Sequence, residues 1–468
     1  MSVSTRFKLL LISLAAIAIA GCDSSDDAQL ASVRVLHAVA DAPLVNVYLN
    51  DDQILENVDF RVGSAYVPVV AGNYDVRVEA IVPGGNVDVI TANGVEFAAN
   101  TATTLAAIGD VSEGTVAPLP IAEPTEAIGA GNLRLRVTHA SPEAPPVYLA
   151  ITPPDFPIDQ AALLGPFSYT QTTDPIETPA GDYQIRVTVK NQPVTDADVV
   201  FDSGTLPLPA GADLHAVAVT STVPSSAAAG SPISVVVLDG EGANDLFDKA
   251  TGANLRAVHN ASGVPAVDVF VDLNDTPIDE NLQIITALGY GTSAGYLSPA
   301  VAAVSYNVGV RVNPNGINDA LNFDADLMAG FGYTVIVNND DVAGVKEQIL
   351  IDDYRPVITE SKVRLVHGSM MAGPVDIYVF SSADALLPAD ADEPTIPNVI
   401  FGQETGFLSL APGSYDIYIT QVGSTVPAIP VTGLPVKAGG VYTAIARDPD
   451  ALDPDDTALG VTLIADEL

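Results

Sequence analysis

The five residues Val33-Arg34-Val35-Leu36-His37 recur three times further along the chain, and this repeat decides the fold. The copies are Leu135-Arg136-Val137-Thr138-His139, Leu255-Arg256-Ala257-Val258-His259 and Val363-Arg364-Leu365-Val366-His367. Their spacing predicts four modules of about 100 to 120 residues, the size of a small domain. In each copy the first, third and fifth residues share one face of an extended chain and the arginine lies on the other, so the motif predicts a β-strand.

The copies continue in the same way after the histidine. A turn with proline comes first, then a strand such as Val45-Asn46-Val47-Tyr48 or Val375-Asp376-Ile377-Tyr378. Later a glycine stands two positions before Tyr74, Tyr183 and Tyr415, whereas the third copy departs from this pattern with Val304-Ser305-Tyr306. Glycine (37 residues) and proline (35 residues) separate short strands of period two, which is typical of an all-β sandwich.

The repeat also sets the expected domain boundaries. We expect β-sandwich modules at residues 31–122, 131–240, 253–352 and 361–468. Linkers are expected around residues 123–131, 239–252 and 353–360, and the one helical stretch at residues 244–251.

The repeated module resembles the tandem domain of unknown function 4397 (DUF4397) of bacterial exported and lipid-anchored proteins. The R-x-x-H opening, the downstream proline, the V-D-V-Y strand and the later Gly-x-Tyr turn carry this resemblance over nearly the whole chain after the leader. It implies four tandem immunoglobulin-like β-sandwich modules and no activity. The Gly-x-Tyr turn is also similar to the tyrosine corner of such sandwiches, in which the hydroxyl bonds back to the backbone.

The N-terminus has the pattern of an export signal. Arg6 and Lys8 precede a charge-free apolar run, Leu9 to Ala20, which is too short to span a bilayer. The following Gly21-Cys22 resembles the lipobox of bacterial lipoproteins, which implies cleavage of a signal peptide, residues 1–21, and a lipid on Cys22. Residues 22–30 would be an acidic tether. The expected location is the cell envelope, anchored to the inner or outer membrane and facing the periplasm or the exterior.

Charge and cysteine content exclude several classes of function. The chain has 18 Lys and Arg against 58 Asp and Glu, a net charge of −40, which repels nucleic acids and anionic lipid heads. Cys22 is the only cysteine, so neither a disulfide framework nor thiol chemistry in the folded part is expected.

The motif histidines invite a catalytic or metal-binding interpretation, but their parity argues against one. His37, His139, His259 and His367 each end the core-facing row of their strand. The expected role is a buried imidazole that bonds a loop carbonyl and closes one end of the sandwich. His215 is the exception: we place it at the strand position of Tyr333 and Tyr442, from which it could approach His139, but one such histidine per module and no cysteine disfavour a paired metal site.

The motif arginines are expected on the outward face. Each has a polar residue twelve positions later, and the pairs are Arg34 with Asn46, Arg256 with Asp268 and Arg364 with Asp376. If the two strands are neighbours, these pairs predict exposed cross-strand contacts.

One hydrolase motif matches by letters. Residues 291–295 fit G-x-S-x-G around Ser293, but a nucleophile elbow needs a strand before it and a helix after it, and here an inter-strand turn is expected.

Acidic clusters are the candidates for calcium. Asp272, Asn274 and Asp275 follow a strand of the third module, and Asp390, Asp392 and Glu393 lie in a loop of the fourth. The best candidate is the run Asp448, Asp450, Asp453, Asp455 and Asp456. None fits the twelve-residue calcium loop and none recurs in all four copies, so solvated loops are the expectation.

These observations predict a non-enzymatic, lipid-anchored envelope protein that binds or spaces proteins or glycans. Its expected partners are the membrane, through the lipid on Cys22, and an envelope protein or glycan that the sequence does not identify; no cofactor is expected. One alternative is a calcium-stiffened, adhesin-like surface stalk. An exported hydrolase is a disfavoured second alternative.

Overall fold

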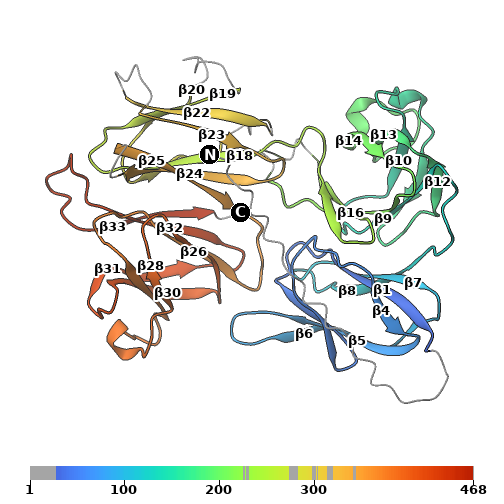
Figure 1. Ribbon diagram of the computed structural model, residues 1–468, viewed down its shortest axis with the longest axis horizontal. Coiled ribbons are helices and arrows are strands. Elements are labelled where there is room, and N and C mark those ends of the chain that lie inside the picture. Colours follow the sequence, from blue (N-terminus) through green and yellow to red (C-terminus); the bar gives the residue numbers. More distant parts are fainter. Residues whose placement is uncertain are drawn as a thin grey trace. The chain divides into compact units, whose positions relative to one another are not determined.

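The computed structural model is all-β, as expected, and builds the chain from repeated two-sheet sandwiches (Figure 1). It describes residues 28–224, 227, 231–273, 283–297, 302, 304–313, 320–340 and 344–466. These residues form eight sheets, two in each module. Each module places four or five strands in the sheet that contains the motif strand and four in the other.

Module 1 shows the arrangement. Its motif sheet has the order β4-β1-β7-β8 and its second sheet the order β3-β2-β5-β6. The strands are β1 (Leu30–His37), β2 (Val45–Leu49), β3 (Asp52–Val58), β4 (Val67–Val70), β5 (Gly72–Ala80), β6 (Val87–Phe97), β7 (Ala102–Ile108) and β8 (Ala117–Glu123). The motif strand β1 pairs antiparallel with β4 and parallel with β7.

Module 2 repeats this topology with one added strand. Its sheets have the orders β12-β9-β15-β16-β17 and β11-β10-β13-β14. The strands are β9 (Asn132–His139), β10 (Val147–Thr152), β11 (Leu164–Phe167), β12 (Ile176–Pro179), β13 (Gly181–Thr188), β14 (Val199–Leu208), β15 (Asp213–Thr220), β16 (Ile233–Leu238) and β17 (Ala243–Leu246). Two short 3-10 helices, η1 (Ile158–Gln160) and η2 (Asp196–Asp198), lie in its loops.

Modules 3 and 4 follow the same plan. Module 3 has the sheets β21-β18-β24-β25 and β20-β19-β22-β23. Its strands are β18 (Asn254–Asn260), β19 (Val267–Leu273), β20 (Gln283–Leu288), β21 (Thr292–Ser293), β22 (Ser305–Val312), β23 (Leu321–Asp326), β24 (Gly332–Asp340) and β25 (Gly344–Asp352).

Module 4 has the sheets β29-β26-β32-β33 and β28-β27-β30-β31, and a 3-10 helix η4 (Pro388–Asp390). Its strands are β26 (Ser361–His367), β27 (Val375–Ser381), β28 (Ile396–Val399), β29 (Glu404–Leu410), β30 (Gly413–Gln421), β31 (Pro427–Val436), β32 (Val441–Arg447) and β33 (Gly460–Asp466).

The alternation of the motif strand places its apolar residues as predicted. Val33 and Val35 of β1 lie in the core between the two sheets of module 1, where they pack with Val47 and Val78 of the second sheet. Val363 and Leu365 of β26 do the same in module 4. Burial of these rows is the main force that holds each sandwich together.

The opposite face of the motif strand is also buried, which the sequence analysis did not expect. The chain divides into two compact units: unit 1 contains modules 1 and 2 apart from Val200–Asp202 and the connection Ser221–Pro232, and unit 2 contains modules 3 and 4. In unit 1, Leu36 of β1 packs with Val217 and Leu238 of module 2. In unit 2, Val258 of β18 packs with Val366 and Ile445 of module 4. Within each unit the two motif sheets therefore pack face to face.

The helix expected at residues 244–251 is wrong. Ala243–Leu246 is β17, which pairs antiparallel with β16 and extends the sheet. The carboxylate of Asp239 accepts the backbone N–H groups of Glu241 and Gly242, and this tight turn leads the chain back into a strand.

The tyrosine-corner contact recurs along the chain, and in module 3 Tyr306 has a backbone hydrogen bond to Ala302, four residues earlier. The hydroxyl groups of Tyr74, Tyr183 and Tyr415 donate to the carbonyl oxygens of Val70, Pro179 and Ala411 at 2.8, 2.8 and 2.9 Å. In each case the acceptor lies four residues earlier, so the contact fixes the turn into the following strand.

Candidate functional site

Each unit has a polar cluster at the centre of its module–module interface, built around the motif arginines. These side chains are among the most buried cations of the chain: Arg34, Arg136, Arg256 and Arg364 are 3%, 8%, 2% and 1% exposed. They come from the middle of the motif strands, on the face that packs against the partner module. A buried guanidinium needs an anion and several acceptors, and each cluster supplies them.

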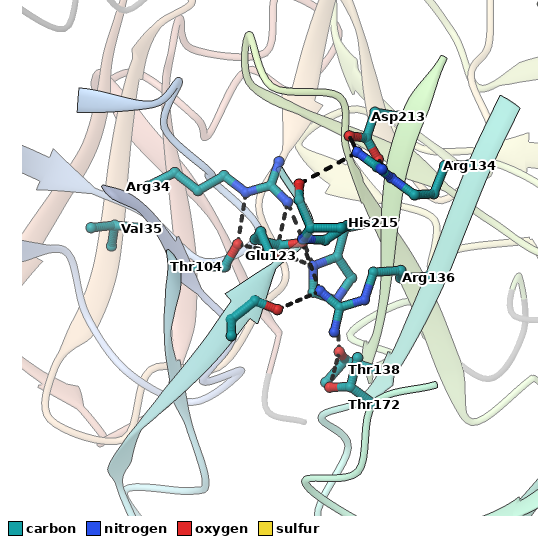
Figure 2. A network of polar contacts seen from close by, with 12 residues as sticks. Arg34, Val35, Thr104, Glu123, Arg134, Arg136, Thr138, Thr172, Asp213 and His215 are labelled. Carbon is teal, nitrogen blue, oxygen red and sulfur yellow. Dashed lines mark hydrogen bonds and ion pairs between the residues drawn. The ribbon is translucent and has the colours of Figure 1, made fainter. Parts of the chain in front are cut away.

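In unit 1 a single carboxylate serves both arginines (Figure 2). Glu123 lies at the end of β8, and its side chain is 5% exposed. Its carboxylate lies 3.0 Å from Arg34 of module 1 and 2.8 Å from Arg136 of module 2. The hydroxyl of Thr104, on β7 beside Arg34, accepts from Arg34 Nε at 2.7 Å and donates to Glu123. The carboxylate thus ties the two modules together.

His215 of β15 completes this cluster. Its Nδ1 lies 2.6 Å from Glu123 Oε1, and a nitrogen so close to a carboxylate oxygen must carry its proton. Its Nε2 then accepts from the hydroxyl of Thr138, at 2.6 Å, and Thr172 bonds Thr138 in turn. The result is a chain of hydrogen bonds from Thr172 to Arg34, with the imidazole in its middle.

Burial and neighbouring cations determine the charge of this cluster. Burial lowers the pKa of His215 below its ordinary value of 6.5, against the hydrogen bond and charge of Glu123, which raise it. Arg34 and Arg136 act in the same direction as burial. Burial alone would raise the pKa of Glu123, but the hydrogen bonds from His215 and Thr104 and the charge of Arg34 hold it well below 4.5. Burial also raises the pKa of Tyr66, which lies under Arg34, to about 12.

Unit 2 has the corresponding cluster with two carboxylates. Asp352, at the end of β25, lies 2.5 Å from Arg364 and 3.5 Å from Arg256, and its side chain is 3% exposed. Asp466, at the end of β33, lies 2.8 Å from Arg256. Thr334 and Thr443 accept from the Nε atoms of Arg256 and Arg364. Each module therefore offers an acid to the arginine of the other.

The strand register corrects the predicted place of His215. Arg34, Arg256 and Arg364 lie opposite Thr104, Thr334 and Thr443, and Arg136 lies opposite His215. His215 is thus the equivalent of these threonines, one residue further along than Tyr333 and Tyr442. A shift of one residue moves a side chain to the other face of the sheet. His215 accordingly faces the module interface, while His139 faces the interior of module 2, so the two imidazoles do not lie together as the disfavoured paired metal site would require.

The four motif histidines make the carbonyl contact expected of them. Nε2 of His37, His139, His259 and His367 lies 3.1, 3.2, 3.0 and 2.6 Å from the carbonyl oxygens of Pro43, Pro145, Pro265 and Gly373. Burial lowers the pKa of His259. The contact joins the end of the motif strand to the next loop in every module.

Each of these histidines also has an aromatic partner that was not predicted from the sequence. The rings of Phe60, Tyr169, Tyr290 and Phe401 stand edge-on to His37, His139, His259 and His367, with ring centroids 5.9 to 6.4 Å apart. The residue after each aromatic has a positive φ, and these residues are Arg61, Thr170, Gly291 and Gly402. An aromatic residue followed by glycine could have pointed to this partner in the sequence. The signal is weak, because two of the four following residues, Arg61 and Thr170, are not glycine.

The predicted arginine contacts with Asn46, Asp268 and Asp376 are wrong. The two strands lie in different sheets of the sandwich, so the partners are not neighbours. These polar side chains instead accept the backbone N–H of the positive-φ residues Asn57, Ala287 and Asn398 on the adjacent strand. They hold irregular hairpins in register.

The other candidate residues do not come together. Ser293 lies in the two-residue edge strand β21, which pairs with β18, and residues 294–297 after it form no helix. Asp448 accepts from the hydroxyl of Ser369 and the backbone N–H groups of Met370 and Met371, and Asp456 pairs with Arg447. Asp390 ends η4. Cys22, Asn274 and Asp275 lie outside the described residues. Within the described residues no three His, Cys, Asp or Glu side chains converge as a metal site would require.

In the cluster of unit 1 a hydroxyl, an imidazole and a carboxylate are hydrogen-bonded in the same sequence as in a catalytic triad. Thr138 is 0% exposed, and the side chains of His215 and Glu123 are 2% and 5% exposed. Every polar atom of this series already bonds another side chain. A nucleophile must reach its substrate, so this arrangement supports assembly of the module pair and not acyl transfer.

Comparison with known proteins gives one family and several distant structures. The family model described as a domain of unknown function (DUF4397) matches residues 31–150 and 253–378. Each match starts at the motif strand of the first module of a unit and ends in the second strand of the next module. No curated protein matches the chain. In the described part of the chain, no helix has the length and apolar character needed to cross a bilayer.

The similar solved structures are too distant to carry an argument. A "putative cell adhesion protein" of Bacteroides uniformis is 13% identical, with 48% of this chain and 99% of that one covered and a TM-score of 0.17. Another, from Parabacteroides distasonis, is 11% identical, with 72% and 99% covered and a TM-score of 0.14. A glycogen-degrading pneumococcal virulence factor, SpuA, is 11% identical, with 85% and 37% covered and a TM-score of 0.16.

The family model, in contrast, covers more than half of the chain and begins each time at the R-x-x-H strand. The histidine of this motif bonds a loop carbonyl at the end of each sandwich, and the arginine pairs with a carboxylate at the interface between two modules. The chain belongs to the DUF4397 family of domains of unknown function.

Proposed function

We propose that the protein is a non-enzymatic, lipid-anchored component of the cell envelope whose paired sandwiches bind or space proteins or glycans. The observation that carries this proposal is that the side chains capable of acid–base chemistry or ion binding are buried in structural contacts. The arginines, Glu123, Asp352 and His215 are enclosed between modules, and the motif histidines bond loop carbonyls. The residues that could act on a substrate are those that hold the scaffold together.

Paired packing supports a scaffold role further. Within a unit, two sandwiches are joined by apolar contacts around a buried ionic cluster, so the two modules form one compact unit. Loops at the sandwich ends remain available for recognition, as in many β-sandwich proteins. A net charge of −40 keeps this surface hydrated and away from nucleic acids.

Anchoring through Cys22 is tested with the whole chain expressed with its own leader. We expect the wild-type protein to sediment with membranes and to incorporate a labelled fatty acid, and the Cys22→Ser variant to lose both properties. Equal membrane association and equal labelling of the two proteins would contradict the anchor.

The absence of catalysis is tested on the purified chain from residue 28. It is incubated with ester, peptide and glycoside substrates beside the Glu123→Gln and Ser293→Ala variants. The expected result is no turnover above the buffer rate in any of them. Turnover that disappears in a variant whose thermal melt and circular dichroism match the wild type would establish an enzyme.

Binding is tested with the same purified chain, immobilised and exposed to envelope extract and to a glycan array. Saturable binding that survives Glu123→Gln and is lost with changes in exposed end loops supports the proposal. Retention of no glycan and no envelope component would leave only the spacer role.

A further inference from the structure

Module 4 has a cavity between its two sheets, apart from the polar cluster of unit 2. Its volume is about 250 Å³, and its walls are almost entirely aliphatic. Ile377, Ile417 and Ile419 line it from the second sheet, and Leu365 and Ala444 line it from the motif sheet. Well-packed interiors have few voids larger than a water molecule, so a space of this size is unusual.

The cavity opens along one edge of the sandwich. Pro430 and Val431 of β31 and Val461 and Leu463 of β33 line it, and these two strands are edge strands of their sheets. Leu463 is 45% exposed although its strand neighbour Ile464 is buried, so solvent reaches the lining at this edge. The lining of β31 runs from Ile429 to Leu434, and these five steps along the strand span about 17 Å. The space is therefore an elongated slot.

The strands at the mouth of the slot carry little charge. β31 contains no charged residue, and the only one in β33 is Asp466, which pairs with Arg256. In module 1 the equivalent strand β6 contains Asp88 and Glu96, while β8 carries only Glu123, the counterpart of Asp466. An uncharged, apolar entrance selects against ionic ligands and suits a neutral, apolar one.

A comparison with module 1 shows which residue makes the room. The corresponding space there is about 20 Å³, with Val35, Val47, Val76 and Val78 among its walls. In the strand register Leu105 lies opposite Val35, whereas Ala444 lies opposite Leu365. The alanine leaves open the space that the leucine side chain fills in module 1.

His367 adds one polar feature to the lining. Its Nε2 bonds the carbonyl of Gly373, and its Nδ1 is buried without a hydrogen-bond partner. In modules 1 and 3 the same atom accepts the N–H of Val39 or Ala261. An imidazole nitrogen without a donor can accept a hydrogen bond from a hydroxyl group.

We propose that module 4 binds a neutral, unbranched hydrocarbon chain that ends in a hydroxyl group, in the slot between its two sheets. By proportion to a 150 Å³ apolar cavity that holds benzene, the slot accommodates about ten non-hydrogen atoms. This site goes beyond the scaffold role proposed above and does not depend on it.

The test uses 1-octanol as the probe and the folded chain from residue 28, with binding measured by titration calorimetry and by methyl chemical shifts. The wild-type chain is expected to bind 1-octanol saturably, with shifts at Ile417, Ile419 and Ile429. Ala444→Leu, which installs the residue of module 1, should weaken binding at least tenfold. The reciprocal Leu105→Ala in module 1 is the matched control and should leave the module 4 site intact.

Two further measurements keep the proposal open to refutation. If Ala444→Leu does not fold, Leu463→Asp places a charge at the exposed mouth and is expected to weaken binding in the same way. Octanoate, the anionic analogue, should bind at least tenfold more weakly than 1-octanol. No saturable binding to the wild type, or undiminished binding to a folded Ala444→Leu variant, would overturn the proposal.

Discussion

The two units solve the same packing problem with different numbers of charges. In unit 2, Asp352 of module 3 pairs with Arg364 of module 4, and Asp466 of module 4 pairs with Arg256 of module 3. This reciprocal exchange is the pattern of a two-fold symmetric interface. In unit 1, Glu123 alone pairs with both arginines.

Unit 1 has one interface carboxylate fewer than unit 2 because strand β16 of module 2 ends early. Glu123, Asp352 and Asp466 lie opposite Ala102, Gly332 and Val441, two residues before the threonine of each module. In module 2 the pairing of β16 with β15 ends at Leu238 opposite His215, so no residue of β16 lies opposite Asp213. His215 replaces the threonine and bonds Glu123 in its place.

The comparison teaches why His215 is held without charge. Two arginines face one carboxylate in the interface of unit 1, whereas two arginines face two carboxylates in that of unit 2. A protonated imidazole would add a third cation to a buried site that already has an excess of one. A neutral imidazole instead donates to the carboxylate and accepts from Thr138.

The largest effect is expected from removal of the shared carboxylates. Glu123→Ala leaves both arginines of unit 1 without the acid that pairs them, and loss of a buried ion-pair partner costs about 3 to 5 kcal/mol. Asp352→Ala should cost less, because Arg256 retains Asp466. Urea unfolding of the whole chain, read for each unit by hydrogen exchange and mass spectrometry, measures both. An equal loss in the two units would contradict the difference in charge balance.

A smaller effect is expected from the motif histidines, which lie outside the interface. His37→Leu leaves the carbonyl of the buried Pro43 without its donor, and an unpaired buried acceptor costs about 1 to 3 kcal/mol. His259→Leu should cost less because Pro265 is exposed and water can replace the donor. The same exchange experiment measures both variants. A larger loss for His259→Leu would show that exposure of the acceptor does not decide the cost.

The pH dependence of unit 1 tests the charge assigned to His215. Because its folded pKa lies below 6.5, the unfolded chain binds more protons than the folded one as the pH falls, and stability decreases below pH 6.5. A second decrease below pH 4.5 follows from the lowered pKa of Glu123. His215→Thr, which copies unit 2, should remove the first decrease and retain the second.

The pH dependence of unit 1 is compared between the wild type and His215→Thr, and not between unit 1 and unit 2. His259 in unit 2 also has a pKa lowered by burial, so both units lose some stability in the same window. Unfolding free energies of wild type and His215→Thr at pH 5.5 and 7.5 give the difference due to His215. A pH profile of unit 1 that is unchanged in the variant would show that the imidazole carries no such role.

The smallest effect is expected from calcium. The oxygens of Asp448 already accept a hydroxyl and two backbone N–H groups, and Asp456 pairs with Arg447. Thermal melts in chelator and in about 2 mM calcium at fixed ionic strength should coincide. A site with a dissociation constant of about 20 µM would add about 2.7 kcal/mol, so a rise of several degrees in unit 2 would establish binding.

The sequence by itself determined the parts of this protein that depend on local pattern. The repeat of Val33-Arg34-Val35-Leu36-His37 determined the number of modules, and its period of two determined that they are β-sandwiches with Val33, Val35 and His37 on the core face. These features follow from the geometry of one strand and from which side chains avoid water.

Tertiary structure alone decided what covers the other face of that strand. A strand that presents Arg34 and Leu36 has the same local pattern whether water or a second sheet lies above it, so the sequence analysis assigned these arginines to the surface. The apolar Leu36, Val258 and Val366 beside them were the available signal. The place of His215 also depended on the register of β15, in which one residue changes the face, and register is set by pairing with distant strands.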